Sequence, residues 1–144
     1  MVRTTAINGQ CLCGQNVLQL EGIPAARAHC HCSSCRDLYG GSFLSATAWH
    51  PDQVSWLAHS AKDYPHPSKQ LIRTYCTSCG EILFGTNRLG MRVIPNIVVA
   101  RSHQGVLPAS LAPEMHLFYG DRIMDINDDL TKYLEGWDGP VLGQ

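Results

Sequence analysis

The chain has 144 residues and a mass of 15.9 kDa, the size of one ordinary domain, and we expect residues 1–144 to form one. Hydrophobic residues make up 44% and charged residues 16% of it, which excludes a disordered, collagen-like or coiled-coil chain. The formal net charge is -1, and the lysines and arginines form no basic run that would favour a nucleic-acid partner. No apolar run approaches the ~20 residues of a membrane span, and the first residues lack the apolar stretch of a secretory signal. We therefore expect a cytoplasmic protein that binds neither membranes nor nucleic acids.

Short apolar stretches rich in β-branched and aromatic residues recur between glycines and prolines, a pattern typical of strands. The predicted strands, in chain order, are residues 17–20, 42–49, 54–57, 70–75, 82–84, 97–100 and 115–119. Frequent prolines argue against long helices between Gly22 and Pro113. One helix is predicted at residues 127–134, where Asn127 is a suitable N-cap and Leu130 and Leu134 are four residues apart. The sequence therefore predicts a mainly β fold with at most short helices.

Seven cysteines fall into three groups with the close spacing of metal ligands. They form a first pair, Cys11 and Cys13, a triplet, Cys30, Cys32 and Cys35, and a second pair, Cys76 and Cys79. At about 5% of the chain they lie below the ~8–10% that marks a disulfide scaffold. In a reducing compartment such cysteines bind metal more often than they form disulfides. Zinc is favoured over iron because none of the spacings matches the common ferredoxin runs.

Seven thiols cannot complete two tetrahedral sites made of cysteine alone, so one of two zinc sites must lack a thiol. The two separated pairs suit a closed structural site. The triplet lies within six consecutive residues, and it can hold one side of a zinc ion while leaving a position for water or substrate. Two alternatives stay open. Cys30 and Cys32 can instead close a site with the second pair and leave Cys35 over, or a histidine can fill the vacant position.

Three histidines deserve comparison with the cysteines as ligands. His29 and His31 flank Cys30, but a residue between two ligands tends to project away from the metal, so we expect both to face solvent or to support the ligands. His116 lies in a predicted strand, and we expect it to be half-buried and hydrogen-bonded rather than a ligand.

The three cysteine groups, in this order and spacing, resemble the glutathione-dependent formaldehyde-activating enzyme family, which includes centromere protein V. The similarity rests on residues 9–14 (GQCLCG), residues 30–36 (CHCSSCR) with Gly40 and Phe43 downstream, residues 73–80 (RTYCTSCG), and Leu83 with Phe84. The resemblance implies a β-tent fold with two zinc ions, a structural one at the two pairs and a catalytic one at the triplet. It also implies condensation of formaldehyde with glutathione to S-(hydroxymethyl)glutathione, which is counted as a carbon–sulfur lyase reaction in the reverse sense.

Formal charge limits the chemistry of the triplet. Zn2+ with three thiolates carries a net charge of about -1, which makes it a weak Lewis acid better suited to holding a fourth thiolate. We therefore expect a thiol such as glutathione to take the vacant position and attack a small aldehyde. Arg36, next to the triplet, and Arg73, three residues before Cys76, are candidates for binding a substrate carboxylate or for offsetting the thiolate charge. The alternative function is a zinc-stabilised binding or zinc-sensing module without catalysis.

Overall fold

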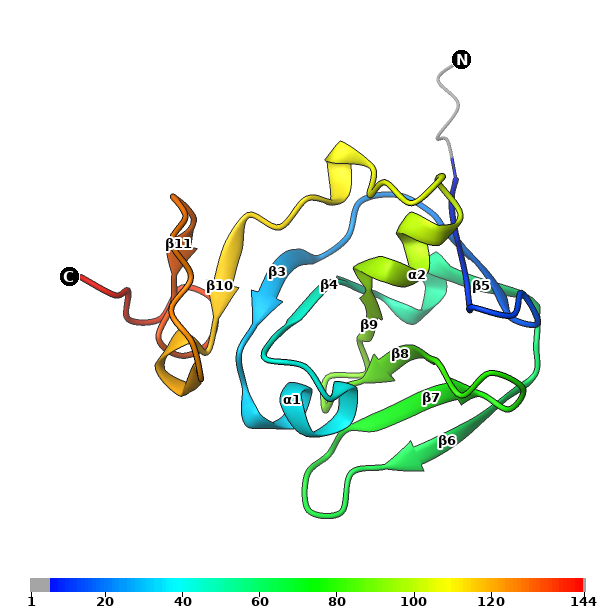
Figure 1. The fold of residues 1–144 in the computed structure, drawn as a ribbon, viewed down its shortest axis with the longest axis horizontal. Coiled ribbons are helices and arrows are strands. Elements are labelled where there is room, and N and C mark those ends of the chain that lie inside the picture. Colours follow the sequence, from blue (N-terminus) through cyan, green and yellow to red (C-terminus); the bar gives the residue numbers. More distant parts are fainter. Residues whose placement is uncertain (1–5, 144) are drawn as a thin grey trace.

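The computed structural model describes residues 6–143, and these residues form mainly strands with short helices between them (Figure 1). The strands are β1 (Ile7–Gln10), β2 (Val17–Leu20), β3 (Ala26–Cys30), β4 (Leu44–Trp49), β5 (Val54–Ala58), β6 (Ala61–Pro65), β7 (Ile72–Cys76), β8 (Ile82–Thr86), β9 (Arg92–Pro95), β10 (Met115–Leu117) and β11 (Thr131–Lys132). The α-helices are α1 (Ser33–Tyr39) and α2 (Asn96–Arg101), and 3-10 turns lie at Pro51–Gln53, Ala109–Leu111 and Tyr119–Asp121. The prediction of a mainly β fold with at most short helices is confirmed. Within the described part of the chain, no helix has the length and hydropathy needed to cross a membrane.

The strands form two sheets. A three-stranded sheet has the order β1-β2-β5, and an eight-stranded sheet has the order β11-β10-β3-β4-β9-β8-β7-β6. β10 pairs in parallel with β3 and β11, whereas the other neighbouring strands of the two sheets pair antiparallel. In Figure 1 the three-stranded sheet lies at the opposite end of the molecule from β10 and β11. The end of β3, where the cysteine triplet begins, is thereby placed inside the larger sheet between β4 and β10.

Two of the cysteines belong to the main apolar core. Cys11, after β1, and Cys76, at the end of β7, are fully buried in one cluster with residues such as Leu18, Leu83 and Val98. The core therefore joins the three-stranded sheet to β7 and β8 around thiol groups. Burying such a cluster is the main favourable term in folding, so one cysteine of each pair lies where the fold gains most of its stability.

One predicted strand, residues 97–100, is wrong because this segment forms α2. Its residues Val98, Val99 and Ala100 are buried in succession, and a short apolar run of this kind does not distinguish a buried strand from a buried helix. The helix packs closely on β1, where an added Cβ at Gly9 would lie 3.1 Å from Val98 Cγ1. Glycine at this position therefore lets the helix approach the strand.

The predicted helix at residues 127–134 is also wrong. The amide of Leu130 donates to Asp128 Oδ1 at 3.1 Å, an aspartate turn that competes with helical hydrogen bonds. The next residues, Thr131–Lys132, form β11 beside β10, and the amide of Tyr133 donates to the carbonyl of His116 at 3.0 Å. Tertiary pairing with β10 therefore overrides the local helix signals.

Candidate metal centres

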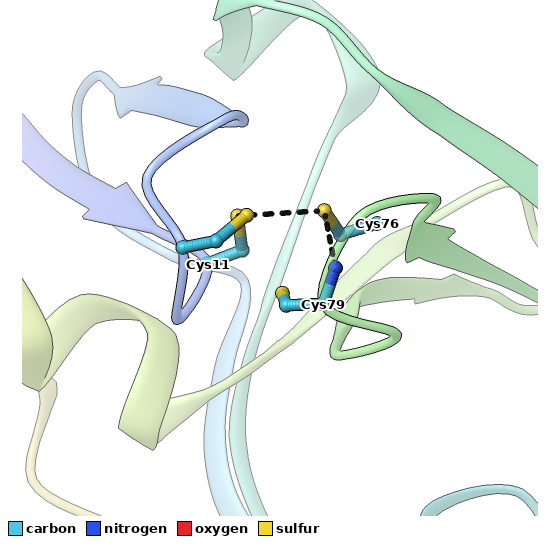
Figure 2. A group of neighbouring side chains, drawn as sticks. Cys11, Cys76 and Cys79 are labelled. Atoms are coloured by element: carbon cyan, nitrogen blue, oxygen red, sulfur yellow. Dashed lines mark hydrogen bonds between the residues drawn. The ribbon is translucent and has the colours of Figure 1, made fainter.

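The two cysteine pairs meet in one four-thiol group. Cys11 and Cys13 lie in the turn after β1, and Cys76 and Cys79 lie at the turn between β7 and β8, with all four Sγ atoms within 4.8 Å of one another. Figure 2 shows the thiols of Cys11, Cys76 and Cys79 converging from these separate loops. The Sγ atom of Cys13 lies 3.6 Å from that of Cys11 and 3.5 Å from that of Cys76. A tetrahedral zinc site needs sulfurs about 3.8 Å apart, so this group fits one metal ion.

Backbone geometry in the four-thiol group stabilises negative charge on Cys76. Gly14 and Gly80 both have φ of 79°, so the two glycines turn the chain after each pair in a conformation that other residues rarely adopt. The amides of Ser78 and Cys79 donate to Cys76 Sγ at 3.3 and 3.4 Å. Burial opposes ionisation of Cys76, but these amide hydrogen bonds outweigh it and lower the pKa of the thiol to about 6. The loop therefore stabilises the thiolate form that a metal ion requires.

An ion pair beside the four-thiol group joins the loops that carry it. Arg101, at the end of α2, donates to Glu81 Oε2 at 2.8 Å and to the carbonyl of Gln10 at 2.9 Å. The other oxygen of Glu81 accepts a hydrogen bond from the amide of Leu12 at 3.0 Å. The Arg101–Glu81 pair thus binds the backbone on both sides of Cys11. Because Glu81 directly follows Gly80, the pair joins this backbone to the loop that carries Cys76 and Cys79.

Replacing Arg101 by alanine is expected to weaken metal binding at the four-thiol group by about 10- to 100-fold, the usual cost of losing a group that orients metal ligands. The measurement is competition for zinc against a chelator of known affinity. The matched control is Arg27→Ala, because Arg27 also pairs with one carboxylate, of Glu114, and one carbonyl, of Ser110, but away from this group. A result in which Arg27→Ala and Arg101→Ala weaken binding equally would contradict the orienting role.

The triplet forms a second, separate thiol group. Cys30 ends β3, Cys32 is the N-cap of α1, and Cys35 lies in the first turn of that helix. Cys30 Sγ lies 3.4 Å from Cys32 Sγ and 3.3 Å from Cys35 Sγ. The strand-to-helix junction therefore brings together three thiols that are spread over six residues of sequence, and the described ligand set stops at three.

The crowding of the triplet makes a cation favourable there. The hydrogen bond that Cys30 donates lowers the pKa of Cys32 far below its usual range, with a further contribution from Cys35. The contact with Cys32 raises the pKa of Cys30, and the contacts with Cys30 and Cys32 raise the pKa of Cys35. Three thiols this close cannot all ionise without a positive charge between them, because each thiolate disfavours the next. A metal ion held by Cys30, Cys32 and Cys35 would supply that charge.

The histidines next to the triplet are part of a buried hydrogen-bonded chain. His31 is fully buried rather than facing solvent, and its Nε2 lies 2.8 Å from Nδ1 of His116, which is also fully buried. His116 Nε2 lies 2.8 Å from Asp128 Oδ2, and Lys132 Nζ donates to Asp128 Oδ1 at 2.8 Å. Burial lowers the pKa of His31 to about 4, so its ring is neutral near pH 7. The chain of hydrogen bonds ties the Cys30–Cys32 turn to β10 and β11.

His29, His116 and Asp128 also place three ligand atoms within 4.8 Å of one another. Both ring nitrogens of His116 already have hydrogen-bond partners, and the ammonium group of Lys132 lies on Asp128. A cation at this point would face a positive charge and displace existing hydrogen bonds. The geometry therefore favours a positioning role for these residues over metal binding.

A cavity of about 550 Å³ has the triplet in its wall. The rest of the wall comes mainly from β3, β4 and β9, from Ser34 and Tyr39 of α1, from the loops at residues 69–71 and 87–91, and from Leu117, Phe118 and Trp137. A wider hollow of about 790 Å³ lies beside Asp128 and Tyr133, and its described lining residues include no cysteine. The first cavity is therefore the one in which a ligand can reach metal-binding thiols.

Neither arginine singled out from the sequence is among the cavity-lining residues. Arg36 donates to the carbonyls of His31 and Asp121, and Arg73 donates to the carbonyl of Leu38 at 2.9 Å. The two cationic residues that do line the cavity are Lys69 and Arg88, which sequence reasoning missed. Their positions in the chain carry no motif, because only folding brings these two loops to the triplet.

Three thiols in a cavity wall, and four more that converge at the edge of the core, define a β protein built around two candidate metal centres. A family model for the glutathione-dependent formaldehyde-activating enzyme matches residues 6–121. The chain therefore belongs to this family, as its cysteine motifs predicted. No curated protein matches. Among solved structures, the crystal structure of a Rhodobacter sphaeroides protein shares 20% sequence identity and a TM-score of 0.56, with 74% of this chain and 98% of that chain covered. At this identity the likeness shows the fold alone.

Proposed function

We propose that this chain is a zinc-dependent carbon–sulfur lyase that forms or cleaves the S-hydroxymethyl adduct of glutathione, or of a related thiol, with a small aldehyde. Membership of the family supports glutathione and formaldehyde as substrates. The observation that carries the proposal is the contrast between the two thiol groups. One offers four ligands, two of them buried in the core, and the other offers three ligands in the wall of a cavity.

The ligand sets fit two zinc ions of different kinds. The two cysteine pairs would hold a structural ion, since four thiolates close a tetrahedral site. The triplet would hold the catalytic ion, whose bound positive charge would lower the pKa of a substrate thiol at the fourth position.

The residues around the cavity have separate tasks in this reaction. Lys69 and Arg88 would bind the carboxylates of the thiol substrate, and Lys69 Nζ is held by a 2.8 Å hydrogen bond to Ser33 Oγ at the start of α1. The sulfur of the substrate attacks the carbonyl carbon, a carbon–sulfur bond forms, and the carbonyl oxygen takes up the proton that the thiol releases. In the reverse step the carbon–sulfur bond breaks, the hydroxyl proton returns to sulfur, and thiol and aldehyde are regenerated.

A carboxylate-binding role for Arg36 and Arg73 stays a prediction. Their backbone hydrogen bonds support a second task, because Arg36 holds the carbonyl of His31 within the triplet and Arg73 holds the last turn of α1 at Leu38. In that task the two arginines keep Cys30, Cys32 and Cys35 in register rather than touch the substrate.

The test uses protein in which cobalt replaces zinc. We expect two metal ions per chain and a change in the cobalt absorption spectrum when glutathione is added, because a thiol enters the open site. S-methylglutathione, which has no free thiol, is the matched control and should leave the spectrum unchanged. If two ions bind and the cobalt spectrum does not change with glutathione, the proposed enzymatic function is contradicted. A zinc-stabilised binding or sensing module is then favoured.

A further inference from the structure

The interior of the triplet's cavity is more apolar than a formaldehyde adduct of glutathione requires. Beyond the three thiols, β3, β4 and β9 contribute mainly small and aliphatic side chains to its wall, including Ala28, Leu44, Ala46 and Val93, and α1 adds Ser34 and Tyr39. Its volume of about 550 Å³ lies within the range of sites for whole small molecules. Formaldehyde adds one carbon to the sulfur, so its adduct would leave most of this wall without an apolar partner.

The opening of the cavity is apolar as well. Three large hydrophobic side chains line it while remaining exposed, Leu89 by 75%, Trp137 by 50% and Phe118 by 37%. Leu89 is held in a tight turn, because Asn87 Oδ1 accepts hydrogen bonds from the amides of Leu89 and Met91, both at 3.0 Å. A fixed turn that presents an exposed leucine to the cavity suits contact with an apolar ligand.

Phe118 occupies strained backbone at the same place. Its φ of 53° and ψ of 38° lie in the left-handed region, which a bulky side chain rarely adopts, and its amide donates to the carbonyl of Glu135 at 2.8 Å. The neighbouring amide of Gly120 donates to the carbonyl of Leu134 at 3.0 Å. These bonds fix the segment that carries Trp137 against the end of β10. Strain of this kind persists where the surrounding structure holds it, often at ligand-binding sites.

Charge at the cavity separates a polar end from the apolar interior. Lys69 and Arg88 are exposed residues of the lining, and among the described lining residues none is acidic. This set matches the carboxylates of glutathione but gives its ammonium group no partner inside the cavity. The glutathione part of a substrate therefore fits at the exposed cations, and the apolar group that fills the interior must come from the aldehyde.

We infer that the cavity is a subsite for the apolar group of the aldehyde, and that the preferred substrates are glutathione adducts of aldehydes bearing an alkyl chain or an aromatic ring. The inference rests on the proposed function and extends it. The bond chemistry is unchanged, because the thiol sulfur adds to the carbonyl carbon and the oxygen gains the proton. The apolar group leaves water for the wall formed by Ala28, Leu44 and Val93 and for the opening at Leu89 and Trp137.

Binding of two inert analogues to the metal-loaded protein tests the subsite by calorimetry. S-hexylglutathione and S-methylglutathione share the peptide and differ only in methylene groups. We expect the hexyl analogue to bind at least about 10-fold more tightly, since each buried methylene adds to affinity. Leu89→Ser should remove much of this preference without changing the affinity for the methyl analogue. The matched control is Leu57→Ser, because Leu57 is a 60% exposed leucine of β5 outside the cavity.

Equal affinities for the two analogues, or an equal effect of Leu57→Ser and Leu89→Ser, would overturn the subsite. A kinetic arm separates this result from failure of the proposed function. The rate at which glutathione exchanges with its hemithioacetal is measured by NMR for formaldehyde and for hexanal. Catalysis that favours hexanal supports the subsite, and catalysis that favours formaldehyde overturns it while the proposed function stands. If neither exchange is catalysed, the proposed function is wrong and the aldehyde subsite falls with it.

Discussion

Replacing Cys76 by serine is expected to lower the free energy of unfolding by at least about 4 kcal/mol, a large part of what a domain of this size has. Cys76 is fully buried in the same apolar cluster as Leu83 and Trp49, and it is one of four thiols that converge there. Serine would leave a poorer ligand for zinc and a hydroxyl in apolar surroundings. In small zinc domains the apparent binding free energy of a structural ion is roughly 10–16 kcal/mol. An expected loss of about 4 kcal/mol in the free energy of unfolding is a modest part of that.

Urea unfolding of the zinc-loaded variant measures this loss, with Cys35→Ser as the control. Cys35 receives the same chemical change but lies outside the main apolar cluster, so its cost should stay below about 2 kcal/mol. If Cys76→Ser does not fold, chelation of the unaltered protein replaces it. One zinc should then leave without loss of structure, and the second should leave only as the protein unfolds. Equal destabilisation by the two serine variants would contradict the assignment of the four-thiol group as structural.

The candidate metal centres follow from the sequence because their ligands come in closely spaced pairs and a triplet along the chain. Close spacing at Cys11 and Cys13, and again at Cys76 and Cys79, leaves few ways to hold a tetrahedral ion, and Gly80 supplies the turn that this spacing needs. The thiol count then predicts one group of four and one of three. The structure brings together both groups in the predicted partition.

The surroundings of these centres could not be predicted in the same way. The helix α1 begins at the triplet, yet only seven residues of weak periodicity form it, and its N-cap is the thiol of Cys32 rather than a usual capping residue. The spacing predicts that His31 projects away from the metal, either into solvent or in support of the ligands, and only the pairing of β3 with β10 shows that it is covered and has His116 as a partner. Each of these features depends on segments far apart in the chain, and tertiary contacts of this kind leave no local pattern.

The residues that line the cavity could not be predicted from the sequence either. Leu89, Phe118 and Trp137 belong to three separate segments, and none of them has a spacing that relates it to the cysteines. Trp137 even lies beyond the residues that the family model matches. Family motifs in the sequence therefore predict the chemistry of the thiols, whereas the groups that would select a substrate become visible only in the folded chain.

Replacing Cys35 by alanine is expected to lower kcat/KM for the adduct reaction by more than about 100-fold, beyond the usual cost of losing a group that merely orients ligands. The substitution leaves two thiols, Cys30 and Cys32, and two thiols cannot hold an ion that must also bind substrate. Alanine is the best helix former, so α1 should persist and the free energy of unfolding should change by less than about 1 kcal/mol. Metal content should fall from two ions per chain to one.

The control on the same helix is Asp37→Ala, because Asp37 is exposed and outside the cavity, and it should keep both ions and full activity. The comparison of Cys35→Ala with Cys76→Ser distinguishes a catalytic ion from a structural one. If the triplet is the catalytic site, one variant loses turnover and keeps stability, while the other loses stability first. If Cys35→Ala loses stability but the unaltered protein shows no turnover to lose, both ions are structural, and the chain is a zinc-stabilised module rather than an enzyme.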